Sequence, residues 1–126
     1  MSEYRFLVVE DSPVMRQLIT FALSRLRGAL VDEAEDGVIG LKMLVGKHYD
    51  LIIIDINMPI MNGLKLIGHI RSNPDTAQIP ILVVTTEGVK EDMTRALELG
   101  ANAYLTKPVD ASRILRIVKK LLAIEE

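Results

Sequence analysis

The sequence predicts an α/β domain in which five parallel strands alternate with five helices to form one doubly wound (βα)5 sheet. Three observations predict this fold. Short β-branched runs alternate with segments of helical periodicity along all 126 residues. Two of these runs, 49–54 and 80–85, are almost entirely aliphatic, as in strands covered by helices on both faces. The connections are short, which favours an open parallel sheet with right-handed crossovers.

The first predicted strand and the first predicted helix are separated by a helix cap. Residues 5–9 form a short aromatic and β-branched run, which favours a strand. Ser12 can cap a helix in which Pro13 takes the first position, where a missing N–H group costs nothing. This helix is predicted from Pro13 to about Leu26, and Gly28 ends it. Its expected apolar residues are Val14, Leu18, Phe21, Ala22 and Leu26.

The middle of the chain predicts two more strands and two more helices. Residues 29–34 are the second strand, and Asp36-Gly37 opens the second helix. Residues 49–54 are the third strand and the expected centre of the sheet. A loop over 57–63 leads into a third helix that ends near residues 72–74. The expected apolar residues of the second helix are Ile39, Leu41, Met43, Leu44 and Val45.

The last third of the chain repeats the strand and helix pattern twice. Residues 80–85 are the fourth strand, and 90–99 form a polar-faced helix that Gly100 ends. A short fifth strand follows over 103–106. An amphipathic helix over 109–123 completes the fold.

Composition and charge limit the classes of function. A chain of 126 residues with 49% hydrophobic content predicts a single domain over 1–126, with no linker and no output domain. The formal net charge of -2 offers no general attraction to nucleic acid or to anionic lipid. The apolar runs are far shorter than the ~20 residues that cross a bilayer, and no signal peptide is apparent. We therefore expect a cytoplasmic protein that recognises its partners locally.

Polar residues close four of the five predicted strands. Glu10 and Asp11 follow the first strand, Asp55 the third, Thr85 ends the fourth, and Lys107 follows the fifth. Because the carboxyl ends of parallel strands share one edge of a sheet, these side chains should converge there. Each residue alone has a structural explanation, such as a helix cap or a turn. Their joint occurrence at successive strand ends favours a functional site.

Three carboxylates in one pocket need a compensating charge. At ~4 Å and an effective dielectric near 20, each pair repels by roughly 4 kcal/mol. Mg²⁺ suits such a site, because it binds one or two carboxylates and keeps several waters. Lys107 adds a positive charge, and the Thr85 hydroxyl can donate to an anionic oxygen. This set is suited to phosphoryl transfer with Asp55 as the nucleophile.

These motifs resemble those of the CheY-like receiver domains of two-component systems. The resemblance covers nearly the whole chain, and it is carried by residues 8–12, 53–59, 62–63, 83–87 and 100–108. It implies a flavodoxin-like sheet with strand order 2-1-3-4-5. It also implies that the chain is a signalling phosphoacceptor rather than an enzyme, phosphorylated on Asp55 by a histidine kinase or a phosphotransfer protein.

The resemblance also implies a role for each site residue. Glu10, Asp11 and Asp55 would bind Mg²⁺ together with the backbone carbonyl of Asn57. The phosphoryl oxygens would be bound by Thr85 and Lys107. Asn57 and Glu87 match the pair that tunes the dephosphorylation rate in the fast-decaying chemotaxis protein. The bond between Lys107 and Pro108 is expected to be cis.

A conformational switch is implied as well. Phosphorylation would draw Thr85 toward the phosphoryl group, and Tyr104 would swing into the vacated space. The fourth helix, fifth strand and fifth helix would then control binding of a downstream protein, for example in chemotaxis or motility. The expected protein is a stand-alone regulator, either a monomer or a phosphorylation-dependent dimer, with no direct binding to nucleic acid or membrane.

Two other functions compete with this prediction, and the sequence differs from many receiver domains at two positions. A flavodoxin-like module for a nucleotide phosphate is disfavoured, because Glu10 and Asp11 put negative charge where a phosphate loop needs exposed N–H groups. A receiver that signals without phosphorylation is disfavoured by the intact site. Many relatives have aspartate at position 10 and phenylalanine at position 109, where this chain has Glu10 and Val109. The longer Glu10 would reach the metal either directly or through a water molecule. His48 and His69 are expected at the surface, outside the site.

Overall fold

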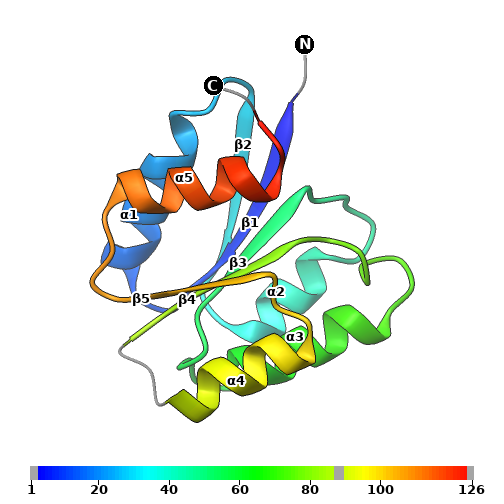
Figure 1. The fold of residues 1–126 in the computed structure, drawn as a ribbon. Coiled ribbons are helices and arrows are strands. Elements are labelled where there is room, and N and C mark those ends of the chain that lie inside the picture. The colour runs from blue at the N-terminus through cyan, green and yellow to red at the C-terminus, as the bar shows by residue number, and fades with distance from the viewer. Residues whose placement is uncertain (1–2, 87–89, 125–126) are drawn as a thin grey trace.

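Five parallel strands form a single sheet with the order β2-β1-β3-β4-β5. The structure is a computed structural model that describes residues 3–86 and 90–124. Figure 1 shows the sheet running through the molecule with helices on both faces. The predicted fold and strand order are therefore confirmed. The strands are β1 (Tyr4–Val9), β2 (Ala29–Ala34), β3 (Leu51–Ile54), β4 (Ile81–Thr85) and β5 (Ala103–Thr106).

Four of the five helices begin at a side-chain cap. Ser12, Asp36, Asn62 and Asp110 each accept a hydrogen bond from a backbone N–H group in the first turn of their helix. Pro13 stands at the start of the first helix, as predicted. The helices are α1 (Pro13–Ser24), α2 (Gly37–Met43), α3 (Gly63–Ser72), α4 (Lys90–Leu99) and α5 (Ala111–Leu121).

The sheet separates two hydrophobic cores. Residues of α2, α3 and α4 pack on one face, with Leu7, Ile52 and Val83 from the strands. Residues of α1 and α5 pack on the other face, with Phe6, Ile53 and Leu82. Adjacent residues of one strand point to opposite faces, so a strand buried on both sides must be apolar throughout. This explains why all residues of β3 and β4 are buried.

The exposed apolar residues correct part of the prediction for α1 and α2. Val14 and Phe21 were expected in the core, but they are 77% and 61% exposed. The core face of α1 is instead formed by Ile19, Ala22 and Leu23. Val45, expected in the second helix, lies beyond its end and is exposed. α1 carries apolar residues on more than one face, so periodicity alone could not choose the buried one.

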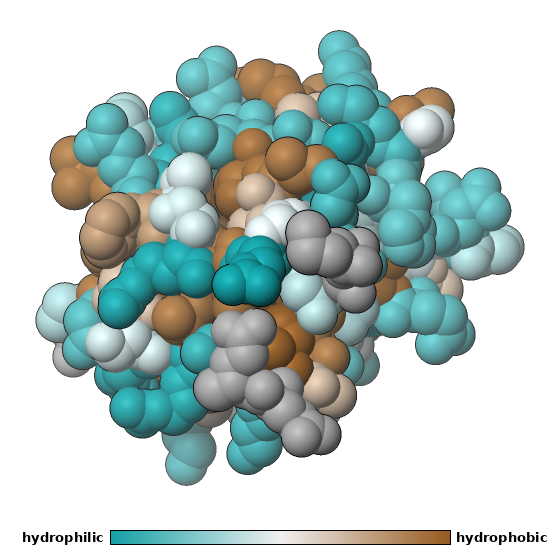
Figure 2. Space-filling model, turned by 90° about the horizontal axis from the view of Figure 1, so that it is seen from above, coloured by the Kyte–Doolittle hydropathy of each residue, from teal (hydrophilic) through white to brown (hydrophobic). Residues whose placement is uncertain are grey.

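The hydrophobic residues on the surface are scattered, as expected when helices cover both faces of the sheet. Viewed from above the orientation of Figure 1, hydrophobic atoms lie in several separate areas among hydrophilic ones (Figure 2). In the described ranges, no helix has the length and apolar composition needed to cross a bilayer.

Strand order reverses around β1, which pairs with β2 on one side and β3 on the other. In open parallel sheets, ligands bind beyond the carboxyl ends of strands at such a point.

Candidate acidic phosphoacceptor site

The predicted residues meet beyond the carboxyl ends of four strands. Glu10 directly follows β1, Asp55 directly follows β3, Thr85 ends β4, and Lys107 directly follows β5. Glu10, Asp55 and Thr85 are almost completely buried, whereas the neighbouring Asp11 is exposed. The site is thus a buried polar pocket with one exposed carboxylate at its mouth.

One ammonium group serves two buried carboxylates. Lys107 Nζ lies 3.0 Å from Glu10 Oε1 and 3.5 Å from Asp55 Oδ2. The lysine side chain is 15% exposed, so solvent screens these ion pairs weakly. The peptide bond that follows, to Pro108, is cis as expected. The ammonium lies where it can also neutralise a new negative charge at Asp55.

Neighbouring groups balance the negative charge of the buried Glu10 carboxylate only in part. Its Oε2 accepts a hydrogen bond of 3.1 Å from the Ser12 backbone N–H. Its buried Oε1 has, apart from the Lys107 ion pair, no hydrogen-bond donor among the described residues. Burial raises the pKa of Glu10 to about 7, and the Asp55 charge adds to the rise, while Ser12 and Lys107 oppose it. The pocket therefore has an unmet demand for positive charge.

The acid cluster fits a hard divalent cation. Glu10, Asp11 and Asp55 each offer a carboxylate oxygen, and these three oxygens all lie within 4.8 Å of one another. Carboxylate oxygens suit Mg²⁺, and the exposed Asp11 leaves one side open for its waters and a phosphoryl group. Glu10 Oε1, which has only the shared Lys107 ammonium as a partner among the described residues, points to the same need. The residues present thus match the donor set that Mg²⁺ requires.

Asn57 connects the acceptor to the end of β4. Its backbone N–H donates to Asp55 Oδ1 at 3.3 Å. Its side-chain amide donates to the hydroxyls of Thr85 at 3.4 Å and Thr86 at 3.0 Å. Asn57 is exposed, so it lies at the solvent-facing edge of the pocket. Its expected partner in rate tuning, Glu87, lies outside the described residues.

Tyr104 has a buried hydroxyl group without a partner. The residue lies in β5 and is half-buried against the core on the α4 side of the sheet. Among the described residues, no donor or acceptor reaches the hydroxyl. Burial raises the Tyr104 pKa, with further contributions from the charges of Asp92 and Asp55. An unpaired buried hydroxyl typically costs about 1–3 kcal/mol of stability.

The structure adds site residues that the sequence did not indicate. Arg16, one turn into α1, donates from Nη1 to the backbone carbonyls of Glu10 at 2.8 Å and Asp11 at 3.4 Å. Gly63 starts α3 so close to the Asp55 backbone that a Cβ atom there would lie 2.3 Å from the Asp55 carbonyl oxygen. Arg16 contacts backbone carbonyls, which carry no side-chain signal, so sequence patterns could not have revealed its role.

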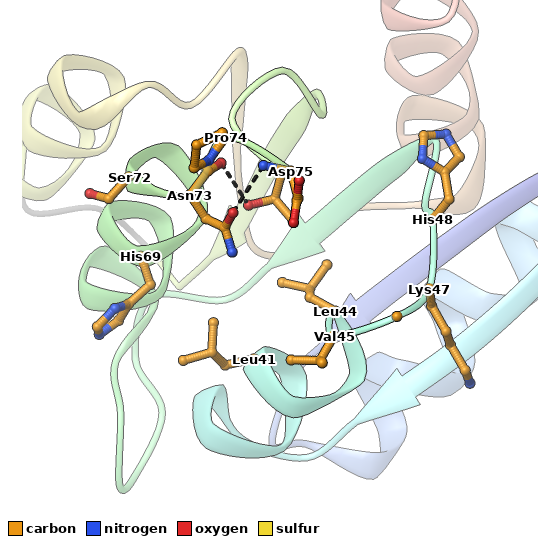
Figure 3. A pocket seen from close by; sticks show the side chains of 12 residues that line it. Leu41, Leu44, Val45, Lys47, His48, His69, Ser72, Asn73, Pro74 and Asp75 are labelled. Atoms are coloured by element: carbon orange, nitrogen blue, oxygen red, sulfur yellow. Dashed lines mark hydrogen bonds between the residues drawn. The ribbon is translucent and has the colours of Figure 1, made fainter.

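Other parts of the chain lie away from this edge. His48 and His69 are exposed, as expected, and Val109 is buried against the α5 side of the sheet. A hollow of about 880 Å³ lies near the amino ends of the strands, between the end of α2 and the end of α3. Figure 3 shows Leu41 and Leu44 in this hollow, with His69 on the α3 side and Lys47 and His48 on the other. None of the acidic site residues lines it.

The sheet order and the buried acid–lysine pocket together define the receiver class of signalling protein. The chain belongs to the response regulator receiver domain family, whose model matches residues 6–119.

Named relatives agree with this family. The chain is 44% identical over 105 residues to Chemotaxis protein CheY1 of Helicobacter pylori (strain ATCC 700392 / 26695), which covers 82% of this chain and 85% of that protein. The high-resolution structure of chemotaxis response regulator CheY4 of Vibrio cholerae matches with a TM-score of 0.88 and 30% identity, covering 96% of this chain and 100% of that one.

A further solved structure bears on the metal site. The receiver domain of a sensor histidine kinase from Pseudomonas aeruginosa PAO1 matches with a TM-score of 0.87 and 28% identity, covering 97% of this chain and 99% of that one. That structure has a magnesium ion coordinated in its active site cleft. A CheY-type receiver fold with an acidic cluster that can hold a metal is therefore established for this chain.

Proposed function

We propose that the protein is a response regulator in which Asp55 accepts a phosphoryl group from a phosphohistidine of a kinase or phosphotransfer protein. The observation that carries this proposal is the shared ion pair: Lys107 Nζ lies between the buried carboxylates of Glu10 and Asp55. A buried carboxylate beside an ammonium and a hydroxyl is suited to attack phosphorus and to stabilise the charge that develops.

The reaction follows from these contacts. An Asp55 carboxylate oxygen attacks phosphorus and forms the new P–O bond, while the P–N bond of the phosphohistidine breaks and its electron pair returns to the imidazole. The phosphoryl oxygens would be bound by Lys107 and by the hydroxyl of Thr85. Mg²⁺, held by Glu10, Asp11 and Asp55 with the Asn57 carbonyl, would neutralise charge on the phosphoryl oxygens. Later attack of water on phosphorus breaks the P–O bond to Asp55, releases inorganic phosphate and a proton, and restores the Asp55 carboxylate.

The same site can change a distant surface. Thr85 would turn from its contact with Asn57, at 3.4 Å, toward a phosphoryl oxygen. Tyr104, whose hydroxyl has no partner, would then take the space that Thr85 leaves. β5 lies beside α4 and α5. The two arrangements of Thr85 and Tyr104 would therefore present different surfaces of α4, β5 and α5 to a partner protein. This supports phosphorylation-controlled binding of a downstream protein.

A role in chemotaxis or motility is the pathway we propose. The support is that CheY1 of Helicobacter pylori and CheY4 of Vibrio cholerae, both similar to this chain, are named as chemotaxis proteins. We further propose that residues 1–126 act as one cytoplasmic receiver domain whose output is protein binding.

Acetyl phosphate tests the proposal without a kinase. The protein is incubated with Mg²⁺ and acetyl phosphate, and its intact mass is measured beside that of Asp55→Asn. We expect one phosphoryl adduct on the wild type and none on the variant, and in the same sample a change in the NMR signals of the Tyr104 ring. An equal adduct on both proteins, or none on either, contradicts Asp55 as acceptor. Unchanged Tyr104 signals in the phosphorylated protein contradict the switch alone.

A further inference from the structure

A second groove lies between α3 and α4, away from the acidic pocket. Figure 1 shows the two helices side by side on one face of the sheet. The groove has a volume of about 610 Å³, which is within the usual range for ligand sites. Its lining residues are Asn62, Leu64, Lys65, Gly68, His69, Ser72, Arg95 and Leu99.

Among the described residues, the ionisable side chains that line this groove are all basic. Lys65, His69 and Arg95 are exposed, and none of them has an ion-pair partner among the described residues. Among the residues that the structure describes, no carboxylate lines the groove, although α4 carries Glu91, Asp92 and Glu98 elsewhere on its surface. By contrast, Lys47 in the hollow of Figure 3 is paired with Asp32 at 3.5 Å. The α3–α4 groove is therefore a local positive site in a chain with a net charge of -2.

Gly68 is a second and independent sign of a ligand. Gly37, Gly40 and Gly63 are glycines because a Cβ atom would collide with a neighbour at 2.9 Å or less. The described glycines Gly28, Gly46 and Gly100 have positive φ angles. Gly68 has neither reason: it lies inside a helix with a helical backbone, and a Cβ atom there would meet nothing within 4 Å.

A glycine inside a helix destabilises it relative to alanine. Nothing within the described protein explains this cost at Gly68. The missing side chain leaves the α3 backbone bare in the groove, between Lys65 and His69. The space is thus available for close approach by a group from outside the protein. The half-buried Leu64 and Leu99 give the same groove an apolar component.

We propose that the α3–α4 groove binds an acidic amphipathic segment of a partner protein. Carboxylates of the segment would pair with Lys65 and Arg95 and accept a hydrogen bond from the ring N–H of His69. Its apolar side chains would contact Leu64 and Leu99, and its backbone would pass over Gly68. Basic groups around an apolar strip between two helices match the requirements of an amphipathic peptide. This binding does not require phosphorylation of Asp55, so its test is independent of the proposed phosphoryl transfer.

The test uses a synthetic peptide built from glutamate and leucine at amphipathic helical spacing. The peptide is titrated into ¹⁵N-labelled full-length protein, and a peptide with lysine in place of glutamate is the control. We expect saturable amide shifts confined to α3 and α4 with the acidic peptide only. Charge reversal by Lys65→Glu with Arg95→Glu should weaken binding by at least about tenfold. The matched reversal of two exposed residues elsewhere, Lys42→Glu with Arg113→Glu, should change it by less than about twofold.

Gly68→Ala separates a ligand site from a merely structural glycine. The added methyl group should raise the melting temperature by about 3 °C, because the helix gains propensity and nothing clashes. It should also weaken peptide binding by at least about threefold, because it fills the space over α3. Binding that is unchanged in both Gly68→Ala and the groove reversal, shifts located elsewhere, or no saturation would overturn the proposal. Saturation of the same groove by inorganic pyrophosphate but not by the peptide would also overturn it, in favour of a small phosphate ligand.

Discussion

Two polar clusters lie at opposite edges of the sheet, and they differ in how completely their groups are satisfied. At the carboxyl edge, Glu10, Asp55 and Lys107 form the phosphoacceptor pocket. At the amino edge, Arg71 lies near the end of α3 and contacts the segments that lead into β4 and β5. Its hydrogen-bond partners among the described residues include no carboxylate.

The amino-edge cluster satisfies its charge with neutral acceptors. Arg71 donates to the carbonyl of Gly100 from Nε at 3.1 Å and Nη2 at 2.9 Å, and to the carbonyl of Ala77 at 2.9 Å. It also donates to Asn102 Oδ1, which accepts from the Ile81 backbone N–H as well. Burial lowers the pKa of Arg71, yet four hydrogen bonds hold the guanidinium in one position. This cluster joins three chain segments.

In the carboxyl-edge cluster, by contrast, the negative charge is not fully balanced. Two carboxylates share one ammonium, and Glu10 Oε1 has no further donor among the described residues. A cluster that holds the fold together gains stability by satisfying every group. A cluster that binds a metal and a phosphoryl group must leave part of its charge for them. The difference therefore separates a structural cluster from a reactive one.

The largest expected effect is at the amino edge. Arg71→Ala should lower the free energy of unfolding by about 3 kcal/mol, because three part-buried hydrogen bonds to backbone carbonyls are lost, each worth about 1 kcal/mol. Urea denaturation measures this loss. Arg95→Ala, which removes an exposed arginine, should stay within about 0.5 kcal/mol of the wild type. A loss at position 71 no larger than at position 95 would mean that the cluster does not hold these segments together.

The next effect is at the carboxyl edge and depends on Mg²⁺. At a concentration ten times its dissociation constant, Mg²⁺ should raise the free energy of unfolding by about 1.4 kcal/mol over the value in EDTA. Asp11→Asn should remove most of this gain, because it deletes a carboxylate of the cluster. Asp75→Asn, at an exposed carboxylate outside the cluster, should retain it. Equal Mg²⁺ stabilisation of both variants would place the metal elsewhere.

The smallest expected effect concerns a single hydrogen bond. As in the amino-edge cluster, its donor and its acceptor are both paired. Buried Tyr49 donates to Asp32 Oδ2 at 2.7 Å, and this bond is the main cause that lowers the pKa of Asp32. Tyr49→Phe should therefore cost about 1 kcal/mol at pH 7.

The pH dependence of this effect has a defined sign. Because the folded pKa of Asp32 is below its unfolded value, its contribution is present above about pH 4 and is lost as the pH falls through the folded value. The difference in the free energy of unfolding between wild type and Tyr49→Phe should thus be smaller in acid. Urea denaturation at pH 7 and pH 3 can measure this change. A gap that is constant over this range would assign the loss to packing instead of the charged hydrogen bond.

Much of the site was predictable because its residues stand at strand ends. Glu10, Asp55, Thr85 and Lys107 follow or end apolar runs, and parallel topology brings such ends to one edge. Arg71 was not predictable, since its acceptors are backbone carbonyls that carry no side-chain signal. The exposure of Val14 and Phe21 was missed for a related reason, because both have an apolar character suited to either face of α1.

By itself, the sequence determined the alternation of strands and helices, the buried strands, and the chemical types gathered at the carboxyl edge. These properties depend on local periodicity and on residues next to each strand. Only the tertiary structure decided which face of α1 is buried, how Lys107 is shared between two carboxylates, and that Gly68 borders an unfilled basic groove. These outcomes depend on distances between segments far apart in the chain, which sequence patterns do not specify.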